Sequence, residues 1–470
     1  MIEKNFIPDG FREMMTRMLG EPDSAILLSA LEGEPDVAIR INACKPPSSE
    51  LYDGIRPVAW CDSAFYLPSR PNFTGNPLLH AGAFYVQDAS STIYETIVGR
   101  LGFGGPVRAA DLCAAPGGKT TAMLNALPAG SVMLANEFVA PRANILKENL
   151  CKYGYPDVVI TNSDTSRLAA MRGYFNLVAI DAPCSGEGMM RKEEVARSQW
   201  SEGLVCKCAE LQRAIIDNAV EMLAPGGYLI YSTCTFNTIE DEDNAAYVAG
   251  TCGLAPVDTG LAGSYGIRSQ VKGNVPCLRF MPGFTRGEGL FVAVFKKDDI
   301  VSGEDFSANR NSRGGRRRSP DSGKGNQKID KGLLSLAGSL LKEEMVIRQH
   351  GTRLLAMSEG VASLLERLPK DVRILSAGVA IGDVKGKDLI PAHQLALSSV
   401  FSRSYPEVEL GEEDALRYLS RESIILPPGT PKGYVTATFD GYPLGFLKNI
   451  GNRSNNLYPA EYRIRALHSS

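Results

Sequence analysis

Two of the ten cysteines in this 470-residue chain lie in sequence contexts that suit chemistry. Cys184 follows Asp-Ala-Pro directly after an apolar segment, and Cys234 lies between two threonines after another such segment. Both segments read as strands of one sheet, so their neighbouring ends would bring the two thiols over one pocket. A single cysteine at a strand end is usually a small core residue, and ten cysteines in a chain this long are not a disulfide scaffold. The pairing therefore predicts a site where a thiolate acts as a nucleophile.

A polar loop follows the first predicted strand of the same sheet, at 107–112. Its glycines let the backbone approach a ligand that a side chain would block. The loop has neither the glycine spacing of a Walker A motif nor that of a dinucleotide fingerprint, so it lacks a full phosphate cradle. A nucleoside cofactor without phosphates, namely S-adenosylmethionine, suits such a loop. Its candidate cofactor-binding residues are Cys113, Ala114, Ala115, Pro116, Gly117, Gly118 and Lys119.

Carboxylates follow three further predicted strands in order. Glu137 comes after the strand 131–136, where an acidic side chain accepts hydrogen bonds from ribose hydroxyls. Asp164 comes after the strand 158–161, at the side expected for adenine, and Asp181 ends the next strand. Any one of these residues alone is equally well explained as a helix cap. Their order along the chain predicts a ligand pocket at the carboxyl ends of parallel strands.

A pair of thiols beside a methyl donor suits methylation of cytosine at C5. This carbon is a poor nucleophile, but a thiolate added at C6 makes it enamine-like, and removal of the C5 proton then expels the thiol. The reaction needs a thiolate, a polar group at the N3/N4 edge of the base and an acceptor for the proton. Cys234, Cys184 and Asp181 can fill these catalytic roles, with Lys119 as an electrostatic aid. The chemistry alone leaves open which cysteine attacks.

Short apolar strands separated by helices surround these residues, which predicts an α/β fold with a doubly wound parallel sheet and helices on both faces. The polar loop opens a helix at 120–127, and a long helix is expected at 206–223. A fifth strand is expected at 228–232. Two late strands separated by a glycine turn, at 278–281 and 290–295, predict an antiparallel hairpin at the end of the sheet.

The composition divides the chain into four expected parts: 1–100, 101–298, 299–332 and 333–470. The first part reads as mixed α/β, with a helix at 6–19 capped by Asp9 and a strand at 37–41. The second part holds the doubly wound sheet. The third is basic and rich in glycine, serine and asparagine, so we expect a flexible linker. The fourth returns to a globular texture.

The overall composition, with 44% hydrophobic and 22% charged residues, is typical of a soluble globular protein. The chain starts without a basic segment followed by an apolar run, and no apolar stretch approaches about 20 residues. We therefore expect a cytoplasmic protein that does not cross a membrane. Four scattered histidines give little support for a metal site. The formal net charge of −3 means that any contact with nucleic acid must come from a local basic surface.

The motifs resemble those of the NOL1/NOP2/Sun family of RNA cytosine-5 methyltransferases, over about residues 35–297. The resemblance implies a Rossmann-like class I methyltransferase sheet, S-adenosylmethionine as the cofactor and RNA as the substrate. Three runs carry it: Asp111-Leu112-Cys113-Ala114-Ala115-Pro116-Gly117-Gly118-Lys119-Thr120, Asp181-Ala182-Pro183-Cys184-Ser185-Gly186-Glu187-Gly188 and Tyr231-Ser232-Thr233-Cys234-Thr235.

The same resemblance implies roles for single residues. Cys234 would form the covalent adduct at C6, and Cys184 would assist release of the product. The implied cofactor-binding residues are the loop 113–119, Glu137, Arg142, Asp164 and Asp181. The chain departs from the family pattern at Gly283, where many relatives place histidine after the proline. This departure concerns a contact on the substrate side.

The flanking parts resemble RNA-contacting regions. Arg40-Ile41-Asn42 resembles an Arg-x-Asn stretch in the family's N-terminal region, and the tail from Pro443 to Pro459 resembles the PUA-like C-terminal domain of the F type of bacterial 16S rRNA methyltransferases. The expected substrate is therefore 16S rRNA or the small ribosomal subunit, bound by a monomer. The basic candidates for RNA contact are Arg40, Arg316, Arg317, Arg318, Lys448, Arg453 and Arg463.

Two other hypotheses stay open on the sequence. The same chemistry on tRNA is opposed only by the resemblance of the C-terminal part. A ribosome-assembly factor that binds RNA without catalysis is opposed by the presence of Cys184, Cys234 and Glu137.

Overall fold

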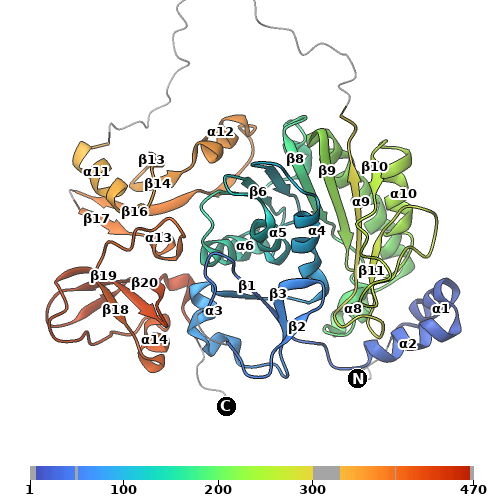
Figure 1. Cartoon of the computed structure of the whole chain (residues 1–470), viewed down its shortest axis with the longest axis horizontal. Helices are drawn as coiled ribbons and strands as arrows, with labels where there is room; N and C mark the ends of the chain where they lie inside the picture. Colours follow the sequence, from blue (N-terminus) through green and yellow to red (C-terminus); the bar gives the residue numbers. More distant parts are fainter. Residues whose placement is uncertain (1–6, 48–50, 300–328, 387, 466–470) are drawn as a thin grey trace, which may run out of the picture.

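The computed structural model describes residues 7–47, 51–299, 329–386 and 388–465. Its largest element is a mixed sheet with the strand order β10-β12-β9-β8-β5-β6-β7-β15 (Figure 1). These strands are β5 (Arg108–Asp111), β6 (Val132–Asn136), β7 (Val158–Thr161), β8 (Phe175–Asp181), β9 (Leu223–Thr233), β10 (Ala255–Val257), β12 (Leu290–Lys296) and β15 (Ile374–Ala377). The five neighbours from β9 to β7 run parallel, whereas β12 and β15 add antiparallel strands on either side of them. The expected doubly wound sheet is therefore present.

Helices cover both faces of this sheet. α4 (Ile93–Arg100), α5 (Gly118–Ala126) and α6 (Ala140–Tyr153) bury apolar side chains on one face. α9 (Glu202–Met222), α10 (Glu242–Gly250) and α12 (Glu359–Arg367) do so on the other. The inner strands are apolar along their whole length because both of their faces are covered.

The strand order reverses between β5 and β8. The chain passes outward from β5 through β6 to β7, and it then returns to β8 on the opposite side of β5. Ligands of open α/β sheets bind at such a switch point, beyond the carboxyl ends of the strands. The late hairpin is also present, because β11 (Leu278–Phe280) pairs antiparallel with β12.

The N-terminal region forms a sheet and a separate helical pair. The antiparallel sheet β2-β3-β1-β4 comprises β1 (Ala38–Ile41), β2 (Arg56–Val58), β3 (Cys61–Tyr66) and β4 (Phe84–Val86). Helices α1 (Asp9–Leu19) and α2 (Glu21–Leu31) pack with Trp200 and Phe236 of the central domain. The predicted capping by Asp9 is wrong. Pro8 holds the N-cap position, and Asp9 is the first helical residue, where its charge faces the positive end of the helix.

The C-terminal region contains two four-stranded sheets. The first has the order β13-β14-β16-β17, and the second has the order β18-β19-β20-β21. Their strands are β13 (Val346–His350), β14 (Arg353–Met357), β16 (Val379–Lys385), β17 (Asp388–Pro391), β18 (Glu407–Glu409), β19 (Gly433–Phe439), β20 (Tyr442–Asn449) and β21 (Ser454–Asn456). Both α12 and the edge strand β15 of the central sheet come from beyond residue 332, so the C-terminal region is built into the central domain.

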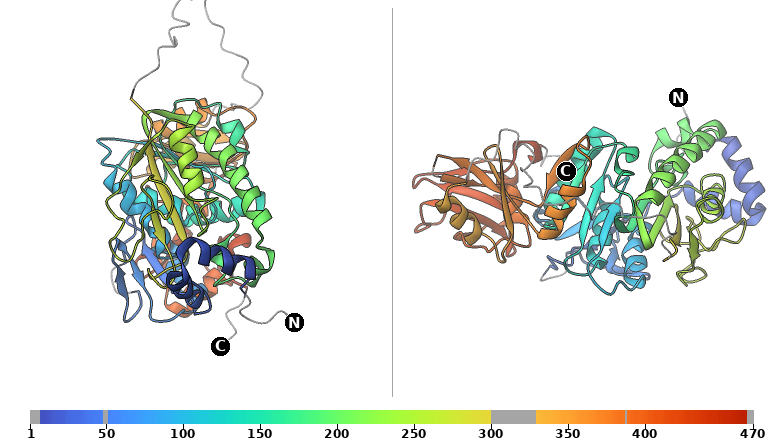
Figure 2. Two further views of the ribbon diagram at one scale, coloured as in Figure 1. Left: turned by 90° about the vertical axis from the view of Figure 1, so that its right-hand side faces the viewer. Right: turned by 90° about the horizontal axis from the view of Figure 1, so that it is seen from above.

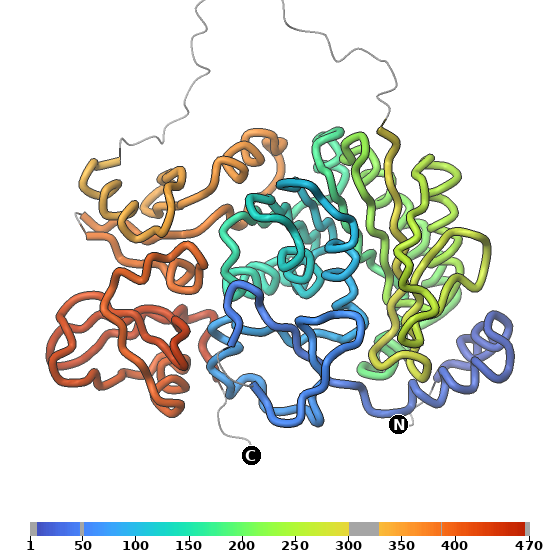
Figure 3. Tube along the Cα trace, viewed as in Figure 1, coloured from blue at the N-terminus to red at the C-terminus, as the bar shows by residue number. Residues whose placement is uncertain are grey.

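The parts form an elongated molecule. Seen from above, the C-terminal sheets lie at one end and helices α1 and α2 at the other (Figure 2). The trace in Figure 3 shows the N-terminal strands beneath the central sheet and next to the second C-terminal sheet. There, α3 (Pro77–Ala81) contributes Ala81 to the core of that sheet. In the described part of the chain, no helix combines the length and apolarity needed to cross a membrane. The arginines Arg316, Arg317 and Arg318 of the predicted linker lie outside the described residues.

Candidate active site

The two cysteines predicted to act together do lie together. Cys184 follows β8 and Cys234 follows β9, and these strands are parallel neighbours with Asp181 opposite Ser232. The two Sγ atoms are 3.1 Å apart, in a partly buried position. The hydrogen bond to Cys234, and then burial, raise the pKa of the Cys184 thiol well above its ordinary value. Cys184 is therefore held as a neutral thiol that can donate to the sulfur of Cys234.

A buried carboxylate fixes the residues on either side of Cys234. The hydroxyls of Thr233 and Thr235 both donate to Asp241, over 2.5 and 2.8 Å. The guanidinium of Arg279 lies 3.3 Å from the other carboxylate oxygen of Asp241. All four of these side chains are buried, so the backbone that presents Cys234 has little freedom to move.

Asp181 and Lys119 form an ion pair beside the thiols. Lys119 Nζ is 2.7 Å from a carboxylate oxygen of Asp181, and the other oxygen accepts a hydrogen bond of 2.8 Å from Ser232. Ser232 in turn lies 2.8 Å from the hydroxyl of buried Tyr94. Burial lowers the pKa of Lys119, but the neighbouring Asp181 carboxylate outweighs it and raises that pKa overall. The lysine is thus a fixed positive charge in the site.

The loop predicted to bind the cofactor turns sharply into α5. Gly117 has a φ of 112°, a conformation that suits glycine, and it is the N-cap of the helix. A Cβ at Gly118 would face Gln87 and Tyr85 at 3.4 Å. This is ordinary packing contact, so Gly118 lies against the N-terminal region, and close approach of the ligand to the glycines stays a prediction. Arg142 donates to the carbonyl of Ala115 over 2.8 Å and so holds the loop from α6.

Carboxylates stand at the ends of the next strands, as expected. The buried side chain of Glu137 accepts a hydrogen bond of 2.8 Å from the backbone of Val139. Asp164 is exposed and caps the short helix α7 (Thr165–Leu168) by accepting from Ser166 over 2.9 Å. Asp164 therefore serves as a helix cap, and its contact with the cofactor stays a prediction.

Asp111, at the end of β5, is a further carboxylate of the site, and the sequence did not predict a role for its side chain. Burial raises its pKa to about 7. Oδ2 accepts a hydrogen bond of 2.7 Å from Thr120, whereas the buried Oδ1 has no hydrogen-bond partner among the described residues. An unpartnered buried acceptor at the switch point suits a ligand that brings its own donor.

This donor set fits S-adenosylmethionine. The edge of the sheet offers carboxylates at four successive strand ends, namely those of Asp111, Glu137, Asp164 and Asp181. Such groups accept from ribose hydroxyls and from an ammonium group, and they disfavour phosphates. Among the described residues, no group of three or more histidine, cysteine or acidic side chains is arranged to hold a metal ion.

The suggested RNA contact by Arg40 is wrong. Arg40 is fully buried, and its guanidinium donates to Tyr153 over 2.7 Å and to Thr121 over 2.6 Å. It also donates to Gln87 over 2.9 Å. Asn42 is equally buried and donates to two backbone carbonyls. Both residues join the N-terminal sheet to α5 and α6, so they support the cofactor loop from behind.

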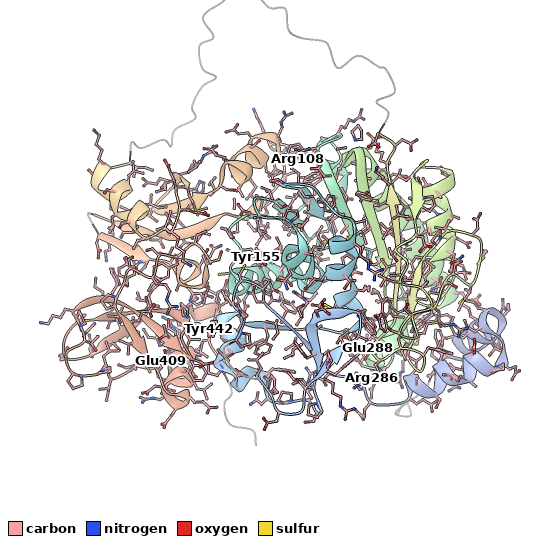
Figure 4. The ribbon with its side chains drawn as sticks, in the orientation of Figure 1. Arg108, Tyr155, Arg286, Glu288, Glu409 and Tyr442 are labelled. Atoms are coloured by element: carbon pink, nitrogen blue, oxygen red, sulfur yellow. The ribbon has the colours of Figure 1, made fainter. Side chains whose placement is uncertain are left out.

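Several charged residues without a predicted role form ion pairs with the segment that follows Cys184 and with the N-terminal region. Arg191, seven residues after Cys184, lies 2.7 Å from Glu288, and both side chains are buried. The backbone of Glu288 donates to Asp88 over 2.9 Å. Arg286 pairs with Asp36 over 2.8 Å. Figure 4 shows Arg286 and Glu288 side by side where the β11–β12 hairpin meets the N-terminal region. These contacts connect the segment after Cys184, the β11–β12 hairpin and the N-terminal region.

The unusual Gly283 has a structural reason. Its φ is 90°, and a Cβ there would lie 2.7 Å from Ile26 Cγ2 and 3.0 Å from the Ile26 carbonyl. Helix α2 therefore packs directly on the backbone at the position where the family resemblance led us to expect a histidine. Here this position makes a contact between the hairpin and the N-terminal helices.

Together, the sheet order, the loop 113–119 and the carboxylates at the strand ends define an S-adenosylmethionine-dependent class I methyltransferase. Three family profiles match the chain and together cover more than two thirds of it. They are the 16S rRNA methyltransferase RsmB/F at residues 107–296, the N-terminal domain of 16S rRNA methyltransferase RsmF at 7–89 and the methyltransferase RsmF PUA domain at 405–464. Residues 107–296 thus form a methyltransferase domain of the RsmB/F family, and the parts on either side of it match two domains of RsmF.

Similar proteins agree with this assignment. The Ribosomal RNA small subunit methyltransferase F of Escherichia coli strain K12 and that of Shigella sonnei strain Ss046 are each 28% identical to the chain, over 97% of this chain and 96% of theirs. Among solved structures, a methyltransferase homolog protein from Pyrococcus horikoshii matches 62% of this chain and 96% of its own, with a TM-score of 0.52 and 22% identity. NSun6 from the same organism, solved with SFG, matches 62% and 98%, with a TM-score of 0.53 and 19% identity. At these identities the solved structures support the fold.

Proposed function

We propose that this protein transfers a methyl group from S-adenosylmethionine to C5 of a cytosine in 16S rRNA, through a covalent bond between Cys234 and C6 of the base. The observation that carries the proposal is the distance of 3.1 Å between the thiols of Cys184 and Cys234. Two thiols this close, next to a cofactor loop and an Asp–Lys pair, suit a reaction that forms and then breaks a carbon–sulfur bond.

The roles of the two cysteines rest on the resemblance to the NOL1/NOP2/Sun family, in which the cysteine of the Thr-Cys run attacks. Cys234 supplies the thiolate that adds to C6, and the raised pKa of the Cys184 thiol suits its role as the neutral partner. Asp181, oriented by Ser232 and Lys119, faces the N3/N4 edge of the base. C5 thereby gains nucleophilic character. S-adenosylmethionine, when bound, supplies the methyl group that C5 accepts.

Release completes the reaction. A water molecule takes the C5 proton, the C5–H electrons re-form the C5–C6 double bond, and the C6–S bond breaks to return the thiolate of Cys234. The thiol of Cys184 assists by donating a hydrogen bond to the departing sulfur. The cofactor is held by the loop 113–119, by Glu137 with Arg142, and by Asp164 and Asp181. The unpartnered Oδ1 of Asp111 suits the ammonium group of the methionine moiety.

The substrate assignment rests on the flanking parts. The relatives that match nearly the whole chain act, by name, on small-subunit ribosomal RNA, and the profile at 405–464 is a PUA domain. Residues 1–100 and 333–470 would hold the RNA, as a monomer in the cytoplasm, while the target base leaves its stack to reach the thiols. Arg453 and Arg463 are exposed in the C-terminal part and suit phosphate contacts.

A labelling experiment tests this function. Purified protein is incubated with S-adenosylmethionine carrying a labelled methyl group and with 16S rRNA, assembled small subunits or tRNA as separate substrates. The RNA is then digested to nucleosides and separated. We expect label in 5-methylcytidine from 16S rRNA or the small subunit. Label in another nucleoside, or transfer to tRNA alone, would contradict the proposal.

A further inference from the structure

Each of the two cysteine loops sends a glutamate into the other. Glu187, three residues after Cys184, accepts hydrogen bonds from the backbone of Phe236 over 2.6 Å and of Asn237 over 3.0 Å. These two residues directly follow the Thr-Cys-Thr run that presents Cys234. A side chain of the loop after β8 therefore holds the loop after β9 in place.

The second glutamate makes the reciprocal contact. Glu240, six residues after Cys234, accepts from the backbone of Ser185 over 3.0 Å and also from its hydroxyl. Ser185 is the residue next to Cys184, so this carboxylate controls where the Cys184 loop lies. Gln212 of α9 donates to the same carboxylate over 2.7 Å and anchors it to this helix.

One side chain joins the two glutamates. The amide nitrogen of Asn237 lies 2.9 Å from an oxygen of Glu187 and 2.9 Å from an oxygen of Glu240. The indole of Trp200 adds a hydrogen bond of 3.0 Å to Glu187. Both glutamates are fully buried, and neither forms an ion pair with a described residue. Neutral donors alone satisfy them.

Two buried carboxylates without a cation lower the stability of the fold, so stability does not explain their presence. Burying a carboxylate without a cation is unfavourable, and apolar side chains of similar volume would pack the same space at less cost. The contacts are also directional, because each carboxylate accepts hydrogen bonds from the opposite cysteine loop, from groups within three residues of the thiol, in addition to those from Trp200 and Gln212. The contacts of the two glutamates therefore constrain the positions of the thiols rather than the packing of the core.

We propose that Glu187 and Glu240 are positioning residues that act on different steps: Glu187 fixes Cys234 for attack, and Glu240 fixes Cys184 for release. This inference rests on the proposed two-cysteine reaction. Because the contacts are reciprocal, loosening one glutamate disturbs mainly the opposite loop. The two glutamates are therefore expected to differ in effect although they share one network.

The test uses Glu187→Gln and Glu240→Gln in the full-length protein. Each substitution replaces an acceptor oxygen by an NH2 group that faces donors, so the opposite loop loses a hydrogen bond. With 16S rRNA and S-adenosylmethionine, E187Q should slow formation of the denaturant-resistant adduct by about tenfold or more. E240Q should form the adduct at near the wild-type rate but release it slowly, so the fraction of enzyme trapped on RNA rises. The same loss of rate in both variants, with an unchanged trapped fraction, would overturn the proposal.

Two further variants keep the result interpretable. Ser185→Ala removes only the hydroxyl donor to Glu240, is small enough to leave folding intact, and should raise the trapped fraction in the same direction as E240Q. No rise in S185A would also count against the proposal. Asp157→Asn alters a partly buried carboxylate at the opposite end of β7 and should leave the trapped fraction unchanged.

Wild-type enzyme and Cys184→Ala run alongside as controls for the reaction itself. If neither forms an adduct, the two-cysteine reaction fails, and this outcome is distinct from failure of the glutamate roles.

Discussion

Lys119 Nζ lies 2.7 Å from the carboxylate of Asp181, so a cation from the cofactor loop neutralises an anion at the end of β8. The pair spans the switch point of the sheet, between β5 and β8, where cofactor and target base must meet. Ser232 and Tyr94 extend it into the core. The site is therefore one connected hydrogen-bond system that joins cofactor loop, carboxylate and cysteine loops.

Replacing Asp181 by asparagine should lower the single-turnover rate of methyl transfer by about 10²–10⁴-fold, the range for a positioned polar group in the transition state. The variant also leaves the half-buried Lys119 without its carboxylate, so the pKa of Lys119 should fall, because burial lowers it and Asp181 no longer raises it. Rapid-quench measurement of labelled RNA gives the rate. A variant that retains the wild-type rate would remove Asp181 from the mechanism.

Arg40→Ala should lower the free energy of unfolding by about 3–5 kcal/mol, because it leaves buried partners without their donor. Arg12→Ala is the matched control, since Arg12 forms an ion pair with Glu32 but has a 41% exposed side chain. Its loss should cost less than about 1 kcal/mol. Denaturant unfolding measures both. An R40A variant with normal stability and weakened RNA binding would instead favour the surface role that the sequence suggested.

The buried carboxyl of Asp111 makes stability depend on pH. Its pKa is raised to about 7 in the folded protein, against about 3.9 for an ordinary aspartate. The folded state therefore holds a proton that the unfolded state has lost, so stability falls as the pH rises from about 4 to 7. Asp111→Asn should flatten this decline in urea unfolding at pH 5, 6, 7 and 8. Asp164→Asn is the control, because the pKa of this exposed carboxyl is lowered in the folded protein. The variant should show the same decline of stability with rising pH as the wild type.

Gly283→His would introduce the residue that the family resemblance led us to expect, yet it should destabilise this protein. The position has a φ of 90°, which costs a non-glycine residue about 1–3 kcal/mol, and the new Cβ would overlap Ile26. Gly99→Ala is the control, because Gly99 lies in α4 with open space where its Cβ would stand. Thermal unfolding should show a lower midpoint for G283H and an equal or higher one for G99A. A G283H variant as stable as the wild type would contradict the packing described here.

Local sequence patterns predicted the central sheet well. The strands at 107–112, 131–136 and 158–161 lie within one or two residues of β5, β6 and β7, because parallel strands covered on both faces are continuously apolar. β9 begins at Leu223, five residues before the expected 228, because Phe175 pairs with Leu223 ahead of the glycine turn. The ordering of loops at the strand ends then followed from the topology, and so did the pairing of Cys184 with Cys234.

Features that depend on tertiary contacts could not be predicted in the same way. The run Glu240-Asp241-Glu242-Asp243 has the composition of a solvated helix start, yet its first three residues are buried. Glu240 and Asp241 hold the cysteine loops, and Glu242 binds Arg279. Arg40 looked like a surface cation because nothing local shows that Tyr153 and Thr121 surround it. The antiparallel β15 joins the sheet from more than 200 residues along the chain. Such partners lie far away in sequence and leave no local periodicity.

The most direct test of the central claim is the covalent state of the Cys184→Ala variant with RNA. The variant is incubated with 16S rRNA and S-adenosylmethionine, denatured and separated on a gel, and the site of attachment is mapped by mass spectrometry. We predict a denaturant-resistant adduct through Cys234 that accumulates because release is lost, and no adduct in Cys184→Ala/Cys234→Ala. A folded Cys184→Ala protein that forms no adduct, or an adduct that persists without Cys234, would contradict the two-cysteine mechanism.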